Sequence, residues 1–83
     1  MRRNIKLDYE DGGTIYLYTH WDGAILQNRL AYSLERARSR WTDESYLARV
    51  IFTDMTASVG EEITGYGLAP YAIDPQYPTL EVN

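Results

Sequence analysis

The stretch that decides the fold runs from residue 4 to residue 20, NIKLDYEDGGTIYLYTH, where two alternating runs flank a turn. Residues 4–9 and 14–20 each alternate apolar and polar side chains, as strands with one buried face do. Asp-Gly in the EDGG between them favours a tight turn, so the two runs are predicted to form a β-hairpin. The core face is predicted to carry Ile5, Leu7, Ile15, Leu17 and Thr19, while Tyr16, Tyr18 and His20 point the other way.

The period becomes helical from residue 24 to residue 40. Apolar side chains recur there within about 80° of one another at about 100° per residue, which predicts an amphipathic helix. These side chains are Leu26, Leu30, Leu34, Ala37 and Trp41. Asp22 is the expected N-cap, so the second strand should run almost directly into this helix.

A second helix is predicted to follow WTDESY, residues 41–46. Thr42 is its expected N-cap, and Trp41 and Tyr46 have the spacing of a hydrophobic staple. Apolar residues between positions 47 and 55 cover about 200° of the helix surface. This second helix should therefore be the central helix of the core.

The last part of the chain is predicted to form a second hairpin, from TGYGLAPYAI (64–73) and DPQYPTLEV (74–82). Its connection is the proline-rich DPQYP, and Pro70 favours an edge strand or a bulge. The order ββααββ predicts an α+β two-layer sandwich, with a largely antiparallel four-stranded sheet and both helices on one face. The whole chain, 1–83, is expected to be a single domain.

The other face of this sheet should then carry tyrosines with nothing left in the chain to cover them. Tyr16, Tyr18 and Tyr71 are the predicted interface residues. An exposed aromatic face favours a partner surface, so a homo-oligomer is expected. The alternative is a solvated face on which tyrosine appears only because it suits strands.

Composition limits the partners. Twelve acidic residues outnumber eight Lys and Arg, and the net charge of −4 disfavours nonspecific binding to nucleic acid. The chain has no cysteine, no leader and no apolar run of about 18 residues, so we expect a cytoplasmic protein that does not bind a membrane. No cofactor is expected.

Three arginines, Arg29, Arg36 and Arg40, fall within about 40° on the first helix and form a predicted ridge beside its apolar stripe. Guanidinium groups suit phosphate, although such residues also neutralise helix ends and form surface ion pairs. Asp54 projects toward the core and needs a partner, for which His20, Arg36, Arg40 or a tyrosine hydroxyl are candidates.

The THWDG at residues 19–23 leaves His20 and Trp21 without a structural explanation. With one histidine and no cysteine the chain lacks the ligands of a zinc site, so no metal is expected. No serine lies in the G-x-S-x-G turn that is typical of a nucleophile. Recognition remains: Trp21 can stack on a ring, His20 can donate a hydrogen bond, and the TGYG turn adds Thr64 and Tyr66. The predicted ligand-binding residues are His20, Trp21, Arg36, Arg40, Thr64 and Tyr66, with no catalytic or metal-binding residue.

YTHWDG, RW followed by DESYLAR, TGYG and the late D-x-x-YP-x-L-x-V together resemble a set of small proteins from phages and actinobacteria with no assigned activity. The resemblance implies a phage-borne accessory protein in the host cytoplasm that counters host defence by binding a host protein. The alternative is a sponge for a phosphorylated, cyclic or linear nucleotide, held by His20, Trp21, Tyr66 and the arginines. A small hydrolase using His20 and Asp54 is the second alternative.

Overall fold

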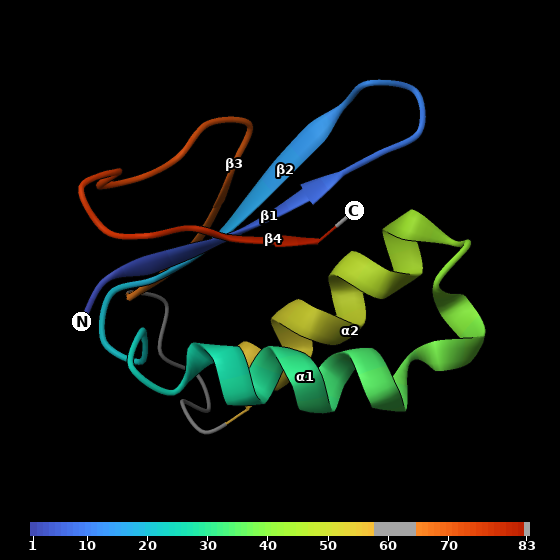
Figure 1. Cartoon of the computed structure of the whole chain (residues 1–83), viewed down its shortest axis with the longest axis horizontal. Helices are drawn as coiled ribbons and strands as arrows, with labels where there is room; N and C mark the ends of the chain where they lie inside the picture. The colour runs from blue at the N-terminus through green and yellow to red at the C-terminus, as the bar shows by residue number, and fades with distance from the viewer. Residues whose placement is uncertain (58–64, 83) are drawn as a thin grey trace.

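The described residues form a sheet that packs on a layer of two helices (Figure 1). The computed structural model describes residues 1–57 and 65–82. The elements are β1 (Arg3–Asp8), β2 (Thr14–Thr19), α1 (Leu26–Arg36), the 3-10 helix η1 (Arg38–Arg40), α2 (Glu44–Thr56), β3 (Tyr66–Ala69) and β4 (Leu80–Val82). The predicted α+β class, the ββααββ order and the placement of both helices on one face of a four-stranded sheet are confirmed.

The first hairpin forms as predicted. β1 and β2 are antiparallel, with Ile5 opposite Leu17 and Leu7 opposite Ile15. Three of these four side chains are buried on the face that the helices cover. Gly12 in the turn has a φ of 92°, a conformation that glycine adopts without strain.

The prediction of a second hairpin is wrong. The strand order is β3-β2-β1-β4, so β3 and β4 occupy opposite edges of the sheet. β3 is antiparallel to β2, with Leu68 opposite Leu17, whereas β4 is parallel to β1, with Leu80 opposite Ile5. β3 ends just before Pro70, which has no N–H to continue the ladder. The proline-rich segment is therefore a long crossing and not a turn, and the sheet is mixed.

This crossing, residues 70–79, covers part of the face that we expected to be bare (Figure 1). Asn4 is fully buried there and donates from Nδ2 to the Ile73 carbonyl at 2.7 Å, and the Ile73 N–H donates back to Asn4 Oδ1 at 3.3 Å. Tyr18 donates to Asp74 at 2.9 Å and is only 7% exposed. The expectation of an uncovered aromatic face is wrong, because the ten residues between β3 and β4 lie against this face and do not form the predicted turn and strand.

The core lies between the sheet and the helices. α1 contributes Leu26 and Leu30, and α2 contributes Leu47, Ala48, Ile51 and Met55. Ala37 also belongs to this core, while Leu34 is half-buried at its edge and Trp41 is 49% exposed. The predicted apolar stripe is thus confirmed over α1 and lost at Trp41, because the helix gives way to η1 before that residue.

The entry to α1 differs from the prediction. The Ile25 N–H donates to the Asp22 carbonyl and the Leu26 N–H to the Gly23 carbonyl, which makes an extra turn before the helix begins at Leu26. Ile25 holds the N-cap position without a side-chain cap from the described residues. Asp22 is therefore free of the capping role and bonds elsewhere.

The entry to α2 is likewise uncapped by Thr42. Asp43 precedes the first helical residue, Glu44, and makes no side-chain capping bond within the part of the chain that the structure describes. The Glu44 carboxylate instead accepts the Glu10 N–H at 2.8 Å, which ties α2 to the β1–β2 turn.

Within residues 1–57 and 65–82, no helix has the length and apolar character needed to cross a bilayer.

Candidate functional site

The end of β2 and the start of β3 enclose an open hollow of about 430 Å³, called the Trp21 hollow below. Its lining residues are Tyr18, His20, Trp21, Gly65, Tyr66, Gly67 and Ile73. It therefore brings together three of the predicted ligand-binding residues, His20, Trp21 and Tyr66. Thr64 lies outside the described residues.

Backbone and hydroxyl bonds fix the turn that carries His20 and Trp21. The His20 N–H donates to the Gly65 carbonyl at 2.8 Å, which extends the pairing of β2 with the residue before β3. The buried Thr19 hydroxyl accepts the Asp22 N–H at 3.1 Å and closes the turn that follows. The predicted place of Thr19 on the core face is confirmed, and hydrogen bonds on both sides hold the turn that carries the two residues after it.

Trp21 lies against Gly65. Gly65 has a φ of 87°, and a Cβ built on it would collide with Cε3, Cζ3 and Cη2 of the indole, three consecutive atoms of its six-membered ring. This arrangement places the glycine under a face of the ring. Trp21 is nevertheless 51% exposed, so a large part of the indole remains open to solvent.

A chain of polar contacts links His20 to the crossing segment. His20 Nδ1 lies 3.1 Å from the Tyr18 hydroxyl, which donates to Asp74 Oδ2 at 2.9 Å. Arg2 Nη1 lies 3.5 Å from the same carboxylate oxygen. Burial, followed by the hydrogen bond to Asp74, raises the pKa of Tyr18, so this phenol keeps its proton at neutral pH.

A second phenol–carboxylate pair closes the other side of the hollow. The Tyr66 hydroxyl donates a hydrogen bond to Asp22 Oδ2, and Arg29 Nη1 lies 3.8 Å from that oxygen. Burial and then the bond to Asp22 raise the pKa of Tyr66. Asp22 is thus the acceptor that positions Tyr66, in place of the predicted helix cap.

Four aromatic rings meet edge to face around this site. The ring centroids are 6.3 Å apart for Tyr18 and His20, 5.8 Å for His20 and Trp21, and 6.1 Å for Trp21 and Tyr66. Such contacts stabilise aromatic clusters and restrict the orientation of each ring. The four rings therefore form one continuous aromatic cluster along the hollow.

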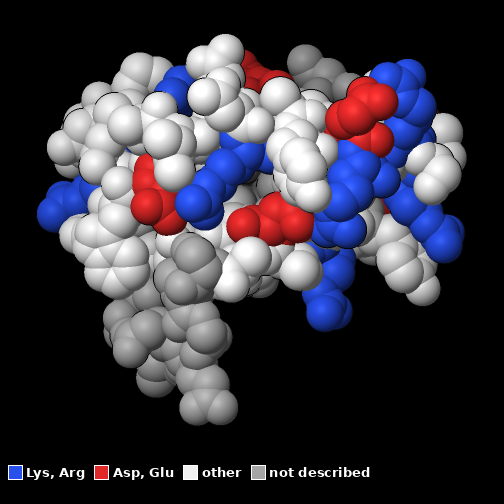
Figure 2. Space-filling view, turned by 90° about the horizontal axis from the view of Figure 1, so that it is seen from below, with Lys and Arg blue, Asp and Glu red and all other residues white. Residues whose placement is uncertain are grey.

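Two arginines of the predicted ridge, Arg36 and Arg40, do not reach the hollow. Arg36 ends α1, which has 11 residues and a length of about 16 Å, whereas Trp21 precedes its first turn. Arg40 belongs to η1, with its guanidinium carbon 4.9 Å from the centre of the Tyr46 ring. The structure therefore separates Arg36 and Arg40 from the other predicted ligand-binding residues. Figure 2, which shows the helix side, has red carboxylates beside the blue arginines.

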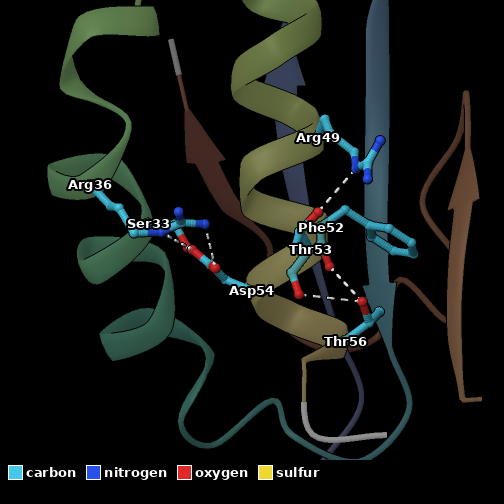
Figure 3. Close-up of polar contacts among 7 residues, drawn as sticks. All are labelled: Ser33, Arg36, Arg49, Phe52, Thr53, Asp54 and Thr56. Atoms are coloured by element: carbon cyan, nitrogen blue, oxygen red, sulfur yellow. Dashed lines mark hydrogen bonds and ion pairs between the residues drawn. The ribbon is translucent and has the colours of Figure 1, made fainter. Parts of the chain in front are cut away.

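Asp54 has the partner that its position required. Arg36 Nη2 donates to Asp54 Oδ1 at 2.7 Å and Arg36 Nε to Oδ2 at 3.4 Å, while the buried Ser33 hydroxyl donates to Oδ2 at 2.6 Å (Figure 3). The hydrogen bond to Asp54 raises the pKa of Arg36. These three residues, called the Asp54 clasp below, join α1 to α2, which confirms Arg36 among the predicted partners.

The remaining polar contacts in Figure 3 are local to α2. Arg49 Nε donates to the Thr53 hydroxyl at 3.1 Å, and the Thr56 hydroxyl donates to the Phe52 carbonyl at 3.0 Å. Such bonds satisfy helix side chains and create no concave site. Within residues 1–57 and 65–82, no three histidine, aspartate or glutamate side chains lie together as metal ligands would.

Two residues are not identified by the sequence: Tyr18 as a hydrogen-bonding group, and Asp74, which lies behind the hollow and accepts the Tyr18 hydrogen bond. The sequence pattern places Tyr18 on a bare face and Asp74 in a turn, because no local signal indicates the crossing segment. The glycines of the TGYG turn indicate close approach of another group, and the contact of Trp21 with Gly65 agrees with this. Comparisons with protein-family models, with curated proteins and with solved structures found no match.

Proposed function

We propose that this chain is a small non-enzymatic binding protein that holds its partner at the Trp21 hollow. The observation that carries the proposal is Trp21, which is 51% exposed although its turn is fixed by hydrogen bonds and its ring lies on Gly65. A rigid, exposed tryptophan supplies a large contact area at a low cost in conformational entropy. The hollow beside it gives a partner side chain a place to enter.

The polar groups support binding more than catalysis. The two residues proposed for a hydrolase, His20 and Asp54, have different partners. His20 contacts Tyr18, whereas Asp54 is bound by Ser33 and Arg36. The Ser33 hydroxyl donates a hydrogen bond to Asp54, and no histidine in the described residues contacts Ser33 as a base. A hydrolase would need a nucleophile next to its base.

A nucleotide sponge is supported less than a protein partner. The guanidinium of Arg36 is engaged by Asp54 at the far end of α1, and Arg40 stacks on Tyr46. Arg29 is near the hollow, but it faces the Asp22 carboxylate. A phosphate would have to compete with Asp54 for Arg36 and with Asp22 for Arg29, and Arg40 lies on η1, away from the hollow.

The resemblance to small phage and actinobacterial proteins adds the proposal that the partner is a host protein, bound in the host cytoplasm to counter a defence system. Expression in bacteria that carry a defence system, followed by phage plating, tests this role. Wild-type protein should raise plating efficiency, and Trp21→Ala should remove the effect. Tyr32→Ala is the matched control, because Tyr32 is 63% exposed on α1 and lies outside the hollow lining.

Equal protection by Trp21→Ala and wild-type protein would contradict a role for the hollow. Failure of the wild-type protein in every defended host would contradict the counter-defence role. Both variants should first be shown to unfold at a similar temperature, so that lost protection reports lost binding.

Self-association through tyrosines also remains a proposal. Tyr18 is buried by the crossing segment, Tyr16 is half-buried, and Tyr71 is 66% exposed. Tyr71 is therefore the most accessible of the three. If this face joins copies of the chain, Tyr71→Glu together with Tyr16→Glu should lower the mass measured by light scattering to that of a monomer; a monomeric wild-type protein at high concentration would contradict it.

A further inference from the structure

The hydrogen-bond chain behind the hollow determines which nitrogen of His20 carries the proton. His20 is the only histidine of the chain. Its Nδ1 contacts the Tyr18 hydroxyl at 3.1 Å, and the same hydroxyl contacts Asp74 Oδ2 at 2.9 Å. Three groups thus share two hydrogen bonds, and their protons can be counted.

An ionised carboxylate only accepts hydrogen bonds, so the single proton of the Tyr18 phenol must be donated to Asp74. The phenol oxygen can then meet His20 only as an acceptor. The proton between them comes from the histidine, which makes neutral His20 the Nδ1–H tautomer. Its other nitrogen, Nε2, consequently carries a lone pair and no proton.

This lone pair has no hydrogen-bond partner among residues 1–57 and 65–82. His20 is half-buried and lines the hollow beside Trp21. The sequence suggested that His20 donates to a ligand; the proton count makes neutral His20 an acceptor.

The charges around the hollow are balanced in pairs. Asp74 faces Arg2, and Asp22 faces Arg29. Tyr18 and Tyr66 each donate to one of these carboxylates and remain neutral. Neither a phosphate nor an ammonium group would find an uncompensated opposite charge among these residues.

We propose that the Trp21 hollow takes the indole of a partner protein's tryptophan, which stacks on Trp21 and donates its N–H to Nε2 of His20. This inference rests on the proposed binding function and names the group that is bound. Tryptophan is the side chain that is flat, uncharged and purely a donor, which matches an open ring face next to a lone acceptor. Tyr18 and Asp74 are positioning residues, because they act on the indole through His20.

The tautomer is tested without any ligand. Long-range ¹H–¹⁵N correlations of the single histidine distinguish the two neutral tautomers, and the wild-type protein at a pH where His20 is neutral should show Nδ1–H. Tyr18→Phe keeps the ring and removes the acceptor, so this variant should lose the preference. A wild-type protein with the proton on Nε2 would overturn the inference.

The ligand class is tested with a matched pair of probes, indole and 1-methylindole, titrated against the full chain and followed by the Trp21 ring resonances. Methylation removes the N–H and keeps the flat ring, so 1-methylindole should bind about threefold to tenfold more weakly. His20→Phe removes the acceptor and should abolish the difference between the probes. Equal affinity of the two probes for the wild-type protein, no binding of indole, or tighter binding of ethylguanidinium would each overturn the inference.

These results are separable from the test of the binding function. If Trp21→Ala abolishes protection in the plating experiment while indole does not bind, the hollow holds a partner through another group and only the indole assignment fails. If indole binds as expected and Trp21→Ala still protects, the site exists but the proposed function does not use it.

Discussion

The two tryptophans are almost equally exposed, yet they differ in what they leave available. Trp41 is 49% exposed, but its Nε1–H donates to the Leu34 carbonyl at 2.8 Å and the guanidinium carbon of Arg38 lies 5.1 Å from its ring centre. Trp21 is 51% exposed, lies on Gly65, and makes no side-chain hydrogen bond within the described residues. Exposure alone therefore does not identify a binding residue. What matters is the hydrogen-bonding group and ring surface that the fold has not already used.

The largest expected effect comes from Gly65→Ala. The new methyl group forces a side chain into a φ of 87° and collides with the Trp21 ring, so the free energy of unfolding should fall by about 2–3 kcal/mol. Urea unfolding measures this change. Gly67→Ala is the control, because its Cβ would meet Ile73 Cδ1 at an ordinary 3.6 Å, and its stability should stay the same or rise by up to about 1 kcal/mol.

The double variant Gly65→Ala, Trp21→Ala separates the two causes. Removal of the indole relieves the collision and leaves only the backbone strain, so the double variant should be more stable than the sum of the single changes implies. Strict additivity would show that Trp21 does not lie on Gly65.

A smaller effect distinguishes the tryptophans themselves. Trp41→Phe removes the hydrogen bond to Leu34 and weakens the contact with Arg38, and it should lower the free energy of unfolding by about 1–1.5 kcal/mol. Trp21→Phe keeps a ring on Gly65 and removes no hydrogen bond to the described residues, so it should cost less than about 0.5 kcal/mol. The reverse order in thermal or urea unfolding would contradict the comparison.

The tyrosines of the hollow predict an alkaline transition. The pKa values of Tyr18 and Tyr66 are raised above 10.0 by burial and by their carboxylate partners. A raised folded-state pKa means that the contribution to stability is complete below pH 10 and is lost as the pH rises through the folded-state value. Absorbance titration of tyrosinate should show late-titrating tyrosines, and Tyr18→Phe and Tyr66→Phe should each remove one; an unchanged late fraction would contradict the hydrogen bonds to Asp74 and Asp22.

How much of this could be predicted depends on the distance along the chain between the groups involved. The hairpin of β1 and β2 and the apolar faces of α1 and α2 follow from periods of two and 3.6 residues, which are local. The need of Asp54 for a partner could also be predicted, because helical projection points its carboxylate inward and a buried carboxylate needs a cation or a hydrogen-bond donor. The pairing of β4 with β1 could not be predicted, since it joins opposite ends of the chain without a turn signal between them.

The candidate site shows the same division. His20 and Trp21 were identified because the strand and the helix start did not explain them, and Tyr66 because it follows the glycine of TGYG. The contact between Tyr18 and Asp74 spans 56 positions and depends on the crossing segment, so no local pattern indicates it. Arg29 and Arg36 lie on α1, whereas Arg40 lies on η1, and only Arg29 lies near the hollow, beside Asp22. The angular position of a residue on a helix says nothing about its distance along the helix axis.

The smallest expected effect is the most specific to the two tryptophans. The Trp41 indole N–H is hydrogen-bonded and should exchange with solvent more slowly than the Trp21 indole N–H. Hydrogen exchange of the two indole cross-peaks measures this directly, and Trp41→Phe and Trp21→Phe assign them. Faster exchange at Trp41 would show that its hydrogen bond to Leu34 is not formed.

The central claim is that Trp21 forms the binding surface because the fold leaves its N–H and part of its ring unused, whereas Trp41 is almost equally exposed but already engaged. Titration of the ¹⁵N-labelled chain with indole tests it most directly, because the protein has two tryptophans and therefore two indole N–H cross-peaks. We predict that the Trp21 cross-peak shifts on titration while the Trp41 cross-peak stays in place. A shift confined to Trp41, an equal shift of both, or no shift of either would contradict the account.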